Sequence, residues 1–305
     1  MRREIGIVGL GKMGTGIAQH LHEKGWRVIV YNRSKDKIDE GAKQGMIPSY
    51  SYREMIEQFE NSPRVVWLML PAGEATDEAI FGAEGVAQFL SKGDIVIDAA
   101  NSFYKDDVRR CHMLGEKGIH YIDVGVSGGP SGARNGACLM VGGSKELFQK
   151  LEQIYADISV ADGYAHFEGI GAGHFVKMVH NGIEYGMMQA IGEGFNVMKK
   201  SEYNLDLAEV ARVYSKKSVI ESRLIGWLEK AYKEFGPDLN AISGAISHSG
   251  EGKWTVETAE EMGQSVPVIK DSYEFRVASQ QKPSYIGKVV SALRGQFGGH
   301  AVKKK

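Results

Sequence analysis

The sequence predicts an α/β protein in which a doubly wound, mostly parallel β-sheet is followed by an all-helical domain. Three observations support this prediction. Short β-rich runs alternate with helix-length segments over the first half of the chain, which is typical of β-α-β units. A glycine-rich turn follows the first of these runs. Strand signals then disappear after about Gly169, and long helical patterns continue to near Gly287.

The expected strands are short runs rich in Val, Ile and Leu. They cover Ile5–Val8, Arg27–Tyr31, Val65–Leu70, Ile95–Asp98, Tyr121–Val124 and Leu139–Val141. Helical patterns lie between them, for example at Gly14–Lys24 and Ser51–Glu60. We expect the domain boundary near residues 163–170, with an N-terminal domain of residues 1–166 and a helical domain of residues 167–305.

Composition narrows the class of protein. The 305 residues are 43% hydrophobic and 25% charged, with a formal net charge of -1, so nothing indicates a nucleic-acid or membrane partner. The longest apolar run, Val65–Ala72, is too short to span a bilayer, and the charged N-terminus does not resemble a signal peptide. Cys111 and Cys138 make no disulfide framework. We therefore expect a cytoplasmic protein.

A glycine-rich turn opens the chain. The segment IGIVGLGKMG has a G-x-G-x-x-G pattern directly after a strand and at the start of a helix. These glycines allow a tight turn, the approach of a pyrophosphate to the backbone, and close packing of helix on strand. The sequence thus predicts a Rossmann-type NAD(P) site with contacts from Gly9, Leu10, Gly11, Lys12, Met13, Gly14 and Leu70.

The residues after the second strand, YNRSK, bear on the choice of cofactor. An NAD site usually has an acidic residue here, which binds the ribose 2′-hydroxyl and would repel a 2′-phosphate. This chain has Asn32, Arg33 and Ser34, whose polar groups can hold a phosphate. We expect NADP, with NAD as the alternative cofactor, although Arg33 could instead be an ordinary surface residue of a turn.

The segment GHFVKMVHNGIEYG, residues 173–186, carries polar side chains that share one face of a helix. These are Lys177, His180, Asn181 and Glu184. Small residues step by four along roughly the opposite face, where we expect another backbone to approach closely. They are Gly182, Gly186, Ala190 and Gly194. By pattern alone, the polar residues could also be the solvated side of an ordinary core helix.

Two further segments place polar groups after expected strands. In DVGVSGGPSG, Ser127, Gly128 and Gly129 offer a hydroxyl and unobstructed backbone N–H groups suited to a substrate carboxylate. A purely structural turn would use the glycines but would not need the serine. Asn101 follows another strand end, where open α/β sheets bind ligands, and we expect it to contact cofactor or substrate.

Taken in order, the glycine-rich turn, VSGG and GAGHFVKMVHN resemble the β-hydroxyacid dehydrogenase superfamily. Other segments are similar to the 6-phosphogluconate dehydrogenase family, namely KMVHNGIEYG, GEGKWT (250–255), YEFR (273–276) and RGQFGGH (294–300). The resemblance covers nearly the entire chain. It is closest to the short form of that family, whose helical domain lacks the duplication of the longer enzymes. The chain departs from the family at Gly295 and Gln296, where an Asp-Tyr pair is more usual.

The resemblance implies oxidation of 6-phosphogluconate at C3, decarboxylation of the resulting β-keto acid, and protonation of an enediol to ribulose 5-phosphate. Lys177 would be the base and then the acid at the C3 oxygen, provided that burial and the cofactor charge lower its pKa. Glu184 would protonate C1, while His180 and Asn181 orient the substrate. No metal is required. The bland alternative for Lys177 and Glu184 is a satisfied ion pair.

The resemblance also implies a phosphate-binding set, consisting of Tyr185, Lys253, Thr255, Arg276, Arg294 and His300. In the family the C-terminal tail comes from the neighbouring subunit, so we expect a homodimer or larger homo-oligomer whose tails complete neighbouring sites. Lys253 could otherwise be a plain surface lysine. Another β-hydroxyacid dehydrogenase, such as one acting on 3-hydroxyisobutyrate, would share Ser127, Lys177 and Asn181 but not the phosphate set. A catalytically silent NADP-binding sensor is the alternative outside the enzymes.

Overall fold

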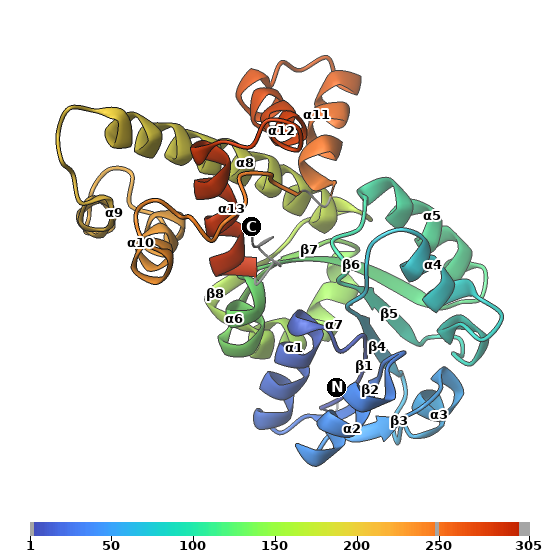
Figure 1. Cartoon of the computed structure of the whole chain (residues 1–305). Helices are drawn as coiled ribbons and strands as arrows, with labels where there is room; N and C mark the ends of the chain where they lie inside the picture. Colours follow the sequence, from blue (N-terminus) through green and yellow to red (C-terminus); the bar gives the residue numbers. More distant parts are fainter. Residues whose placement is uncertain (1–2, 248–249, 299–305) are drawn as a thin grey trace. The chain divides into compact units, whose positions relative to one another are not determined.

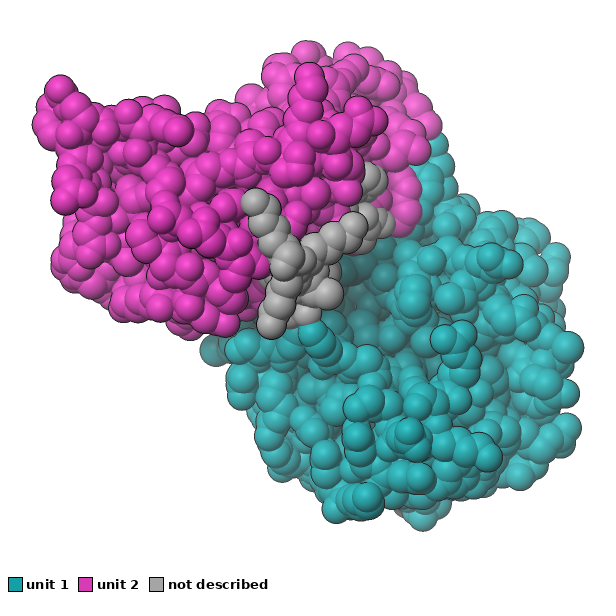
Figure 2. All heavy atoms as spheres, in the orientation of Figure 1, with its two compact units in different colours: residues 1–178 teal, residues 179–305 magenta. Residues whose placement is uncertain are grey.

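The computed structural model describes residues 3–247 and 250–298 and divides the chain into two compact units, residues 1–178 and 179–305 (Figure 2). The division falls within one long helix, α8 (Ala172–Lys200). Each unit contains hydrophobic clusters of its own, and each is described separately below. The predicted domain limits, residues 1–166 and 167–305, stay a prediction.

Unit 1 contains an eight-stranded sheet of order β3-β2-β1-β4-β5-β6-β7-β8 (Figure 1). Its strands are β1 (Glu4–Val8), β2 (Arg27–Tyr31), β3 (Ile47–Ser49), β4 (Val65–Leu68), β5 (Ile95–Asp98), β6 (His120–Ser127), β7 (Ala137–Val141) and β8 (Ser159–His166). Neighbouring strands run parallel except β6 and β7, which are antiparallel. The chain leaves β1 towards β2 and later returns to β4 on its other side, which makes the end of β1 a topological switch point. The predicted doubly wound fold is confirmed.

Helices cover both faces of this sheet (Figure 1). The cluster on one face includes residues of α1 (Lys12–Glu23), α2 (Lys35–Lys43), α6 (Gly129–Asn135) and α7 (Lys145–Ile158). The cluster on the other includes residues of α3 (Tyr52–Glu57), α4 (Glu74–Phe81), the 3₁₀ turn η1 (Val86–Gln88) and α5 (Tyr104–Gly115). Because side chains alternate along a strand, one apolar run supplies both clusters.

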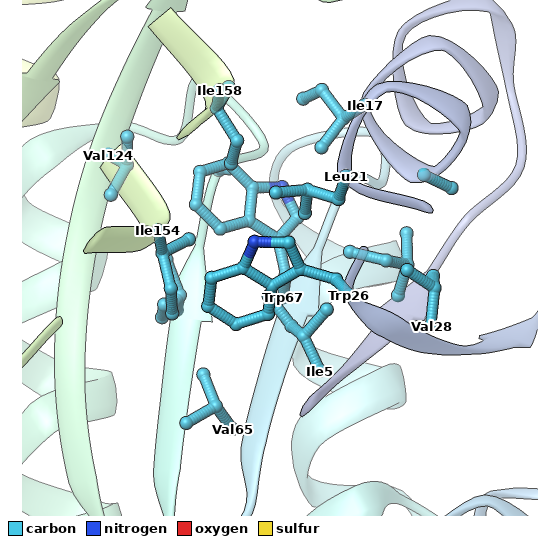
Figure 3. Close-up of a cluster of buried hydrophobic side chains, with 14 of the residues drawn as sticks. Ile5, Ile17, Leu21, Trp26, Val28, Val65, Trp67, Val124, Ile154 and Ile158 are labelled. Atoms are coloured by element: carbon cyan, nitrogen blue, oxygen red, sulfur yellow. The ribbon is translucent and has the colours of Figure 1, made fainter. Parts of the chain in front are cut away.

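Strand β4 shows this alternation. Its Val65 and Trp67 belong to the first cluster, while Val66 and Leu68 belong to the second, and all four are at most 1% exposed. Around Trp67 the first cluster gathers side chains from β1, α1, β2 and α7, with Trp26 beside it (Figure 3). A sheet buried on both faces in this way presents its loops, rather than its strands, to ligands.

Unit 2 is built from the remainder of α8 and five further helices (Figure 1). These are α9 (Leu207–Tyr214), α10 (Arg223–Phe235), α11 (Glu251–Glu261), α12 (Pro267–Ser279) and α13 (Tyr285–Gly298). Their core joins residues of α8, α9, α10 and α13, among them Phe195, Leu228 and Leu293. Within the described part of the chain, none of the helices combines the length and the apolar character needed to cross a membrane.

The glycines of α8 meet side chains of neighbouring helices. A Cβ at Gly182 would lie 2.7 Å from Cγ2 of Thr255 on α11, and one at Gly186 would lie 3.2 Å from Cγ1 of Val268 on α12. Gly194 is exposed with nothing within 4 Å, and Ala190 is exposed as well. The expected backbone approach along this face was therefore wrong, because the space at its first two positions is filled by side chains and its last two are exposed.

Candidate functional site

The glycine-rich turn between β1 and α1 leaves room for a ligand at one of its three glycines. Gly9 has a φ of +94°, and a Cβ there would collide with the carbonyl oxygen of Met69. A Cβ at Gly14 would collide with the carbonyl oxygen of Gly9, whereas Gly11 has nothing within 4 Å. The outer glycines therefore shape the turn, and the middle one keeps the N-terminus of α1 open to a pyrophosphate.

Asn32 supports this turn. Its Oδ1 atom accepts a hydrogen bond from the Leu10 N–H at 3.0 Å, and its Nδ2 atom donates to the Ser34 carbonyl at 3.3 Å. Both ends of the Asn32 amide therefore bond protein atoms. The side chains of Arg33 and Ser34, at the start of α2, are exposed and accessible to a cofactor. Leu10 is buried, Lys12 is exposed, and Met13 and Leu70 are half-buried.

A second loop region lies at the ends of β5 and β6. Asn101, whose φ is +51°, accepts a hydrogen bond at Oδ1 from the Val126 N–H at 3.3 Å. This bond ties the loop after β5 to the strand residue before Ser127. Gly128 and Gly129 follow with φ values of +125° and +62° and open the short helix α6. A side chain would be strained at either position, so the turn presents backbone N–H groups beside a half-buried serine.

The first turns of α8 lie directly on β6. A Cβ at Gly125 would collide with Cβ of Lys177, and one at Gly173 would collide with the carbonyl oxygen of Met140 on β7. Lys177 itself is 5% exposed. Glycine is needed at Gly125 of β6 and at Gly173 of α8, because only a hydrogen atom at both positions allows the helix to approach the sheet so closely. The helix thereby carries a buried lysine against the strand that ends in Ser127.

Asp123 of β6 holds the N-terminus of this helix. Its two oxygen atoms accept hydrogen bonds from the N–H groups of Gly171 at 2.8 Å and His174 at 2.9 Å. A carboxylate here satisfies backbone donors that a helix leaves unpaired, and it also interacts favourably with the helix dipole. Asp123 is fully buried, so this anchoring is shielded from water.

A buried polar network, which we call the α8 anchor network, adjoins this anchoring point. His174 Nδ1 lies 2.8 Å from Asp107 Oδ2, and the single Tyr121 hydroxyl lies within hydrogen-bond distance of Asp107 at 2.7 Å and of Asp98 at 2.9 Å. Arg110 donates to Asp98 at 3.0 Å. We define the network as Asp98, Asp107, Arg110, Tyr121 and His174, all at most 2% exposed.

The network is arranged as two ion pairs. Burial raises the pKa of Asp107 to about 6, against the opposing effect of His174. Burial alone would lower the pKa of His174, but the Asp107 carboxylate outweighs it and raises that pKa to about 9. At neutral pH the pair is therefore Asp107 carboxylate with His174 imidazolium. Asp98, Asp107 and His174 also place potential ligand atoms within 4.8 Å of one another. Because Arg110 and Tyr121 already bond these carboxylates, we interpret the group as a hydrogen-bond network.

The part of the site in unit 2 begins with the polar face of α8. His180 Nδ1 lies 3.0 Å from Asn181 Oδ1 and 3.9 Å from Glu184 Oε2. All three side chains are half-buried. The structure therefore brings His180, Asn181 and Glu184 together, as the helical spacing predicts. Tyr185, the next residue, is 5% exposed.

Tyr185 lies beneath a buried guanidinium. The Arg276 Cζ atom is 3.2 Å from the Tyr185 ring centroid, and Arg276 is 1% exposed. Its Nη1 and Nη2 atoms have no hydrogen-bond partner among the described residues. Burial, reinforced by the nearby positive charge of Arg294, lowers the pKa of Arg276 to about 10. A buried cation whose Nη atoms find no partner among the described residues is costly, and an anion at this position would offset that cost.

Other members of the expected phosphate set lie near this pair or on the surface. Arg294 is 7% exposed, donates to Ser247 Oγ at 2.6 Å, and has a pKa lowered by burial. Thr255 is buried, and its hydroxyl donates to the Glu251 carbonyl at 2.9 Å. Lys253 is half exposed, with its Nζ atom 3.2 Å from Glu257. His300 lies outside the described residues.

Sequence reasoning missed the residues that support the site. Asp123 had the appearance of an ordinary strand residue, and Asp107 and His174 are separated by 67 positions. Gly252 belongs to the GEGKWT segment, where the sequence predicted no role for it, but a Cβ at this position would collide with the Tyr185 ring. The one available signal was the presence of Asp and Gly in the apolar run YIDVGVSGG.

The fold and the glycine-rich turn define a nicotinamide-dependent oxidoreductase, and comparison with known proteins specifies the family. Residues 4–166 match the family model for the NAD binding domain of 6-phosphogluconate dehydrogenase, and residues 173–304 match the model for the C-terminal domain of 6-phosphogluconate dehydrogenase. The chain is 44% identical to YqeC of Bacillus subtilis, named as a candidate 6-phosphogluconate dehydrogenase, over 99% of this chain and 100% of that protein. The chain belongs to the 6-phosphogluconate dehydrogenase family.

Other relatives show both length classes of the family. The NAD-dependent, decarboxylating 6-phosphogluconate dehydrogenase of Haloferax volcanii is 34% identical over 99% of both chains. A structure of the Plasmodium falciparum enzyme, determined with NADP and with 6-phosphogluconate, superposes with a TM-score of 0.81 at 32% identity. It matches 92% of this chain, which spans only 62% of that one. A Salmonella typhimurium 3-hydroxyisobutyrate dehydrogenase shares the fold, with a TM-score of 0.75 at 18% identity over 94% of this chain and 98% of that one.

Proposed function

We propose that the protein oxidises and decarboxylates 6-phosphogluconate to ribulose 5-phosphate and CO2, with NADP as the preferred cofactor and NAD as the alternative. The observation that carries the proposal is the buried Arg276, whose Nη atoms lack partners among the described residues. A phosphorylated substrate supplies the anion that this guanidinium lacks. The Tyr185 beneath it follows Glu184 directly on α8, so the phosphate site adjoins the proposed proton donor.

The turn of unit 1 fits a dinucleotide. Gly11 is open, the N-terminus of α1 faces that opening, and Asn32 fixes the turn from behind. When bound, the nicotinamide accepts a hydride from C3 of the substrate. Arg33 and Ser34 are exposed at the second strand end, where they can bond a 2′-phosphate, and this supports NADP.

Side chains of the protein then accept and donate the protons of the reaction. Lys177 takes the proton of the C3 hydroxyl as the C3–H bond breaks, which requires a neutral amine that burial favours. The resulting ammonium donates to the C3 carbonyl oxygen while the bond to the carboxylate breaks and CO2 leaves. Glu184 donates a proton to C1 of the enediol. Ser127, Gly128, Gly129 and Asn101 bind the carboxylate end and orient the sugar chain, while His180 and Asn181 hold the C3 oxygen and neighbouring hydroxyls.

A 3-hydroxyisobutyrate dehydrogenase is the second candidate, because it would need Ser127, Lys177 and Asn181. Its substrate has no phosphate, so it gives no account of the buried Arg276. The similarity to the Salmonella enzyme, at 18% identity, concerns the fold alone. A silent NADP sensor would need neither Lys177 nor Glu184.

We also propose a homodimer or larger homo-oligomer, located in the cytoplasm. Arg294 bonds Ser247 of its own chain. A contribution of Arg294 to the site of a neighbouring subunit stays a prediction. A contribution in trans by His300 stays a prediction.

The test measures NADPH or NADH formation with 6-phosphogluconate, gluconate and 3-hydroxyisobutyrate, and measures CO2 release in parallel. We expect turnover and CO2 only with 6-phosphogluconate, and a higher kcat/KM with NADP. Turnover of 3-hydroxyisobutyrate without turnover of 6-phosphogluconate would favour the second candidate. No turnover with any substrate, despite NADP binding, would favour the sensor.

A further inference from the structure

We propose that the α8 anchor network positions Lys177, so that Asp107 and His174 act as positioning residues for the reaction; this inference rests on the proposed role of Lys177. His174 lies one turn before Lys177 on α8, and residues three apart on a helix are neighbours on its surface. Both residues are fixed by contacts in unit 1: His174 contacts Asp107 of α5, and Lys177 packs on Gly125 of β6. A shift of the first turn of α8 would therefore move the Lys177 amine.

The network fixes a second part of the site as well. Asp98 accepts hydrogen bonds from the Ala100 N–H at 2.9 Å and the Ser102 hydroxyl at 3.0 Å, which are the residues on either side of Asn101. Asn101 has a positive φ, a conformation that an asparagine adopts at some cost unless its surroundings hold it. The Tyr121 hydroxyl lies between Asp98 and Asp107, and its one proton is shared by the two carboxylates, so this hydroxyl links the Asn101 loop to the helix of Lys177.

The charges of the network are balanced in one protonation state. The charged or titratable groups around His174 are Asp107 and Arg110 of α5, Asp98 of β5, and Tyr121 and Asp123 of β6. Within the network, protonated His174 and Arg110 match the charges of Asp98 and Asp107, while Asp123 adds a buried carboxylate beside His174 and Asp77 shares Arg110. Loss of the His174 proton would leave a further buried carboxylate unmatched, which is costly.

This arrangement predicts a pH dependence. The raised pKa of His174 means that its stabilising contribution is complete below about pH 6.5, its ordinary value, and is lost as the pH rises through about 9. The raised pKa of Asp107 acts in the same direction, since ionisation of this buried carboxyl weakens the folded state as the pH rises through about 6. Positioning of Lys177 should therefore fail on the alkaline side.

The test compares Asp107→Asn with the matched control Asp94→Asn. Asp94 is also buried and also pairs with an arginine, accepting from Arg64 Nη1 at 3.1 Å and from the Ser91 N–H at 2.8 Å. It precedes β5, and among the described residues its carboxylate bonds Arg64 and Ser91 rather than α8, α5 or the Asn101 loop. Three quantities are measured for each variant: kcat and KM with 6-phosphogluconate and NADP, the pH profile of kcat, and amide hydrogen exchange of residues 172–178.

For Asp107→Asn we expect kcat to fall roughly ten- to hundredfold, as for a misplaced catalytic group, with KM values within about threefold of the parent. The alkaline limb of its pH profile should move to lower pH, because burial then lowers the pKa of His174 against only the weaker opposing effects of Asp98 and Asp123. Exchange at residues 172–178 should increase. Asp94→Asn should reproduce none of these changes, whatever its effect on unfolding.

The proposal is overturned if Asp107→Asn matches Asp94→Asn in kcat, pH profile and exchange. If Asp107→Asn does not fold, Tyr121→Phe, which removes only the linking hydroxyl, is judged by the same three measurements. If the parent protein does not turn over 6-phosphogluconate, the proposed function fails, and exchange at residues 172–178 still decides whether the network holds the helix.

Discussion

Replacing Arg276 with methionine should make the empty protein more stable and the enzyme far worse at binding its substrate. The reason is the state of the guanidinium, which is 1% exposed, has no bonds at Nη1 and Nη2 to the described residues, and lies near the cationic Arg294. Methionine is similar in length, uncharged, and packs well on an aromatic ring such as Tyr185.

The magnitude follows from the pKa and the contact. Burial lowers the pKa of Arg276 to about 10 from the ordinary value of arginine, so the charged form costs roughly 3 kcal/mol, at about 1.4 kcal/mol per factor of ten. This cost applies at any pH below the lowered pKa. Loss of the stacking contact on Tyr185 destabilises the variant by up to about 2 kcal/mol, which offsets part of this gain. The net expectation is a gain of roughly 1 kcal/mol, or a few degrees in Tm.

Substrate binding should change in the opposite direction. Removing one member of a buried charge pair commonly costs about 2–5 kcal/mol, so KM for 6-phosphogluconate should rise roughly thirty- to five-thousandfold. Thermal unfolding is measured with and without substrate, together with steady-state kinetics. Bound substrate should raise the Tm of the parent protein, and this increase should disappear in the variant.

Arg223→Met is the matched control. Arg223 stacks on Trp227, with Cζ 4.9 Å from the ring centroid, but it is exposed. The control should leave KM unchanged and alter stability by no more than about 0.5 kcal/mol. If Arg276→Met instead lowered the Tm and left KM unchanged, Arg276 would be a structural cation and the phosphate site would lie elsewhere.

Three further predictions follow from the proposed roles. Arg33→Ala should reduce kcat/KM with NADP about ten- to hundredfold and change little with NAD, and equal losses with both cofactors would refute its role at the 2′-phosphate. Lys177→Met should abolish both NADPH formation and CO2 release, whereas Glu184→Gln should slow protonation of the product and spare single-turnover NADPH formation; an equally severe block of that step by Glu184→Gln would show that the roles are wrongly divided. Verified heterodimers of Lys177→Met and Arg294→Ala chains should regain activity because the tail is expected to act in trans, while inactive heterodimers would show that Arg294 serves its own chain.

The sequence predicted the buried strands well and the edge strands poorly. Five of the six expected strands coincide with the structure at both ends or differ by no more than two residues, and the two strands without a prediction are β3 and β8, the outermost in the sheet. An edge strand pairs on one side only, so it needs no continuous apolar run. Strand β3 is three residues long and contains Pro48, and β8 includes Asp162 and Gly163. Neither gives a strand signal in the sequence.

The site divides in a similar way. Its glycines and the polar face of α8 follow local spacing, so the sequence places them correctly on one turn or one helix. The α8 anchor network depends on contacts between residues far apart in the chain, such as Tyr121 with Asp98 and Asp107 with His174. Nothing in local spacing reports such contacts. For the same reason the sequence could not distinguish Lys253, which pairs with Glu257 at the surface, from the buried Arg276.

Comparison of two buried arginines distinguishes a structural role from a ligand-binding role. Arg110 is 0% exposed and donates to Asp77, Asp98, Ser102 and the Gly73 carbonyl, so its pKa is raised although burial alone would lower it. Arg276 is equally buried, but burial lowers its pKa, because no carboxylate among the described residues forms an ion pair with it that would outweigh burial. Folding alone accounts for the first arginine, since every bond it needs is present. It does not account for the second, whose Nη atoms have no partner among the described residues. An incoming anion would supply that partner, and this contrast is the strongest physical argument for a phosphorylated substrate.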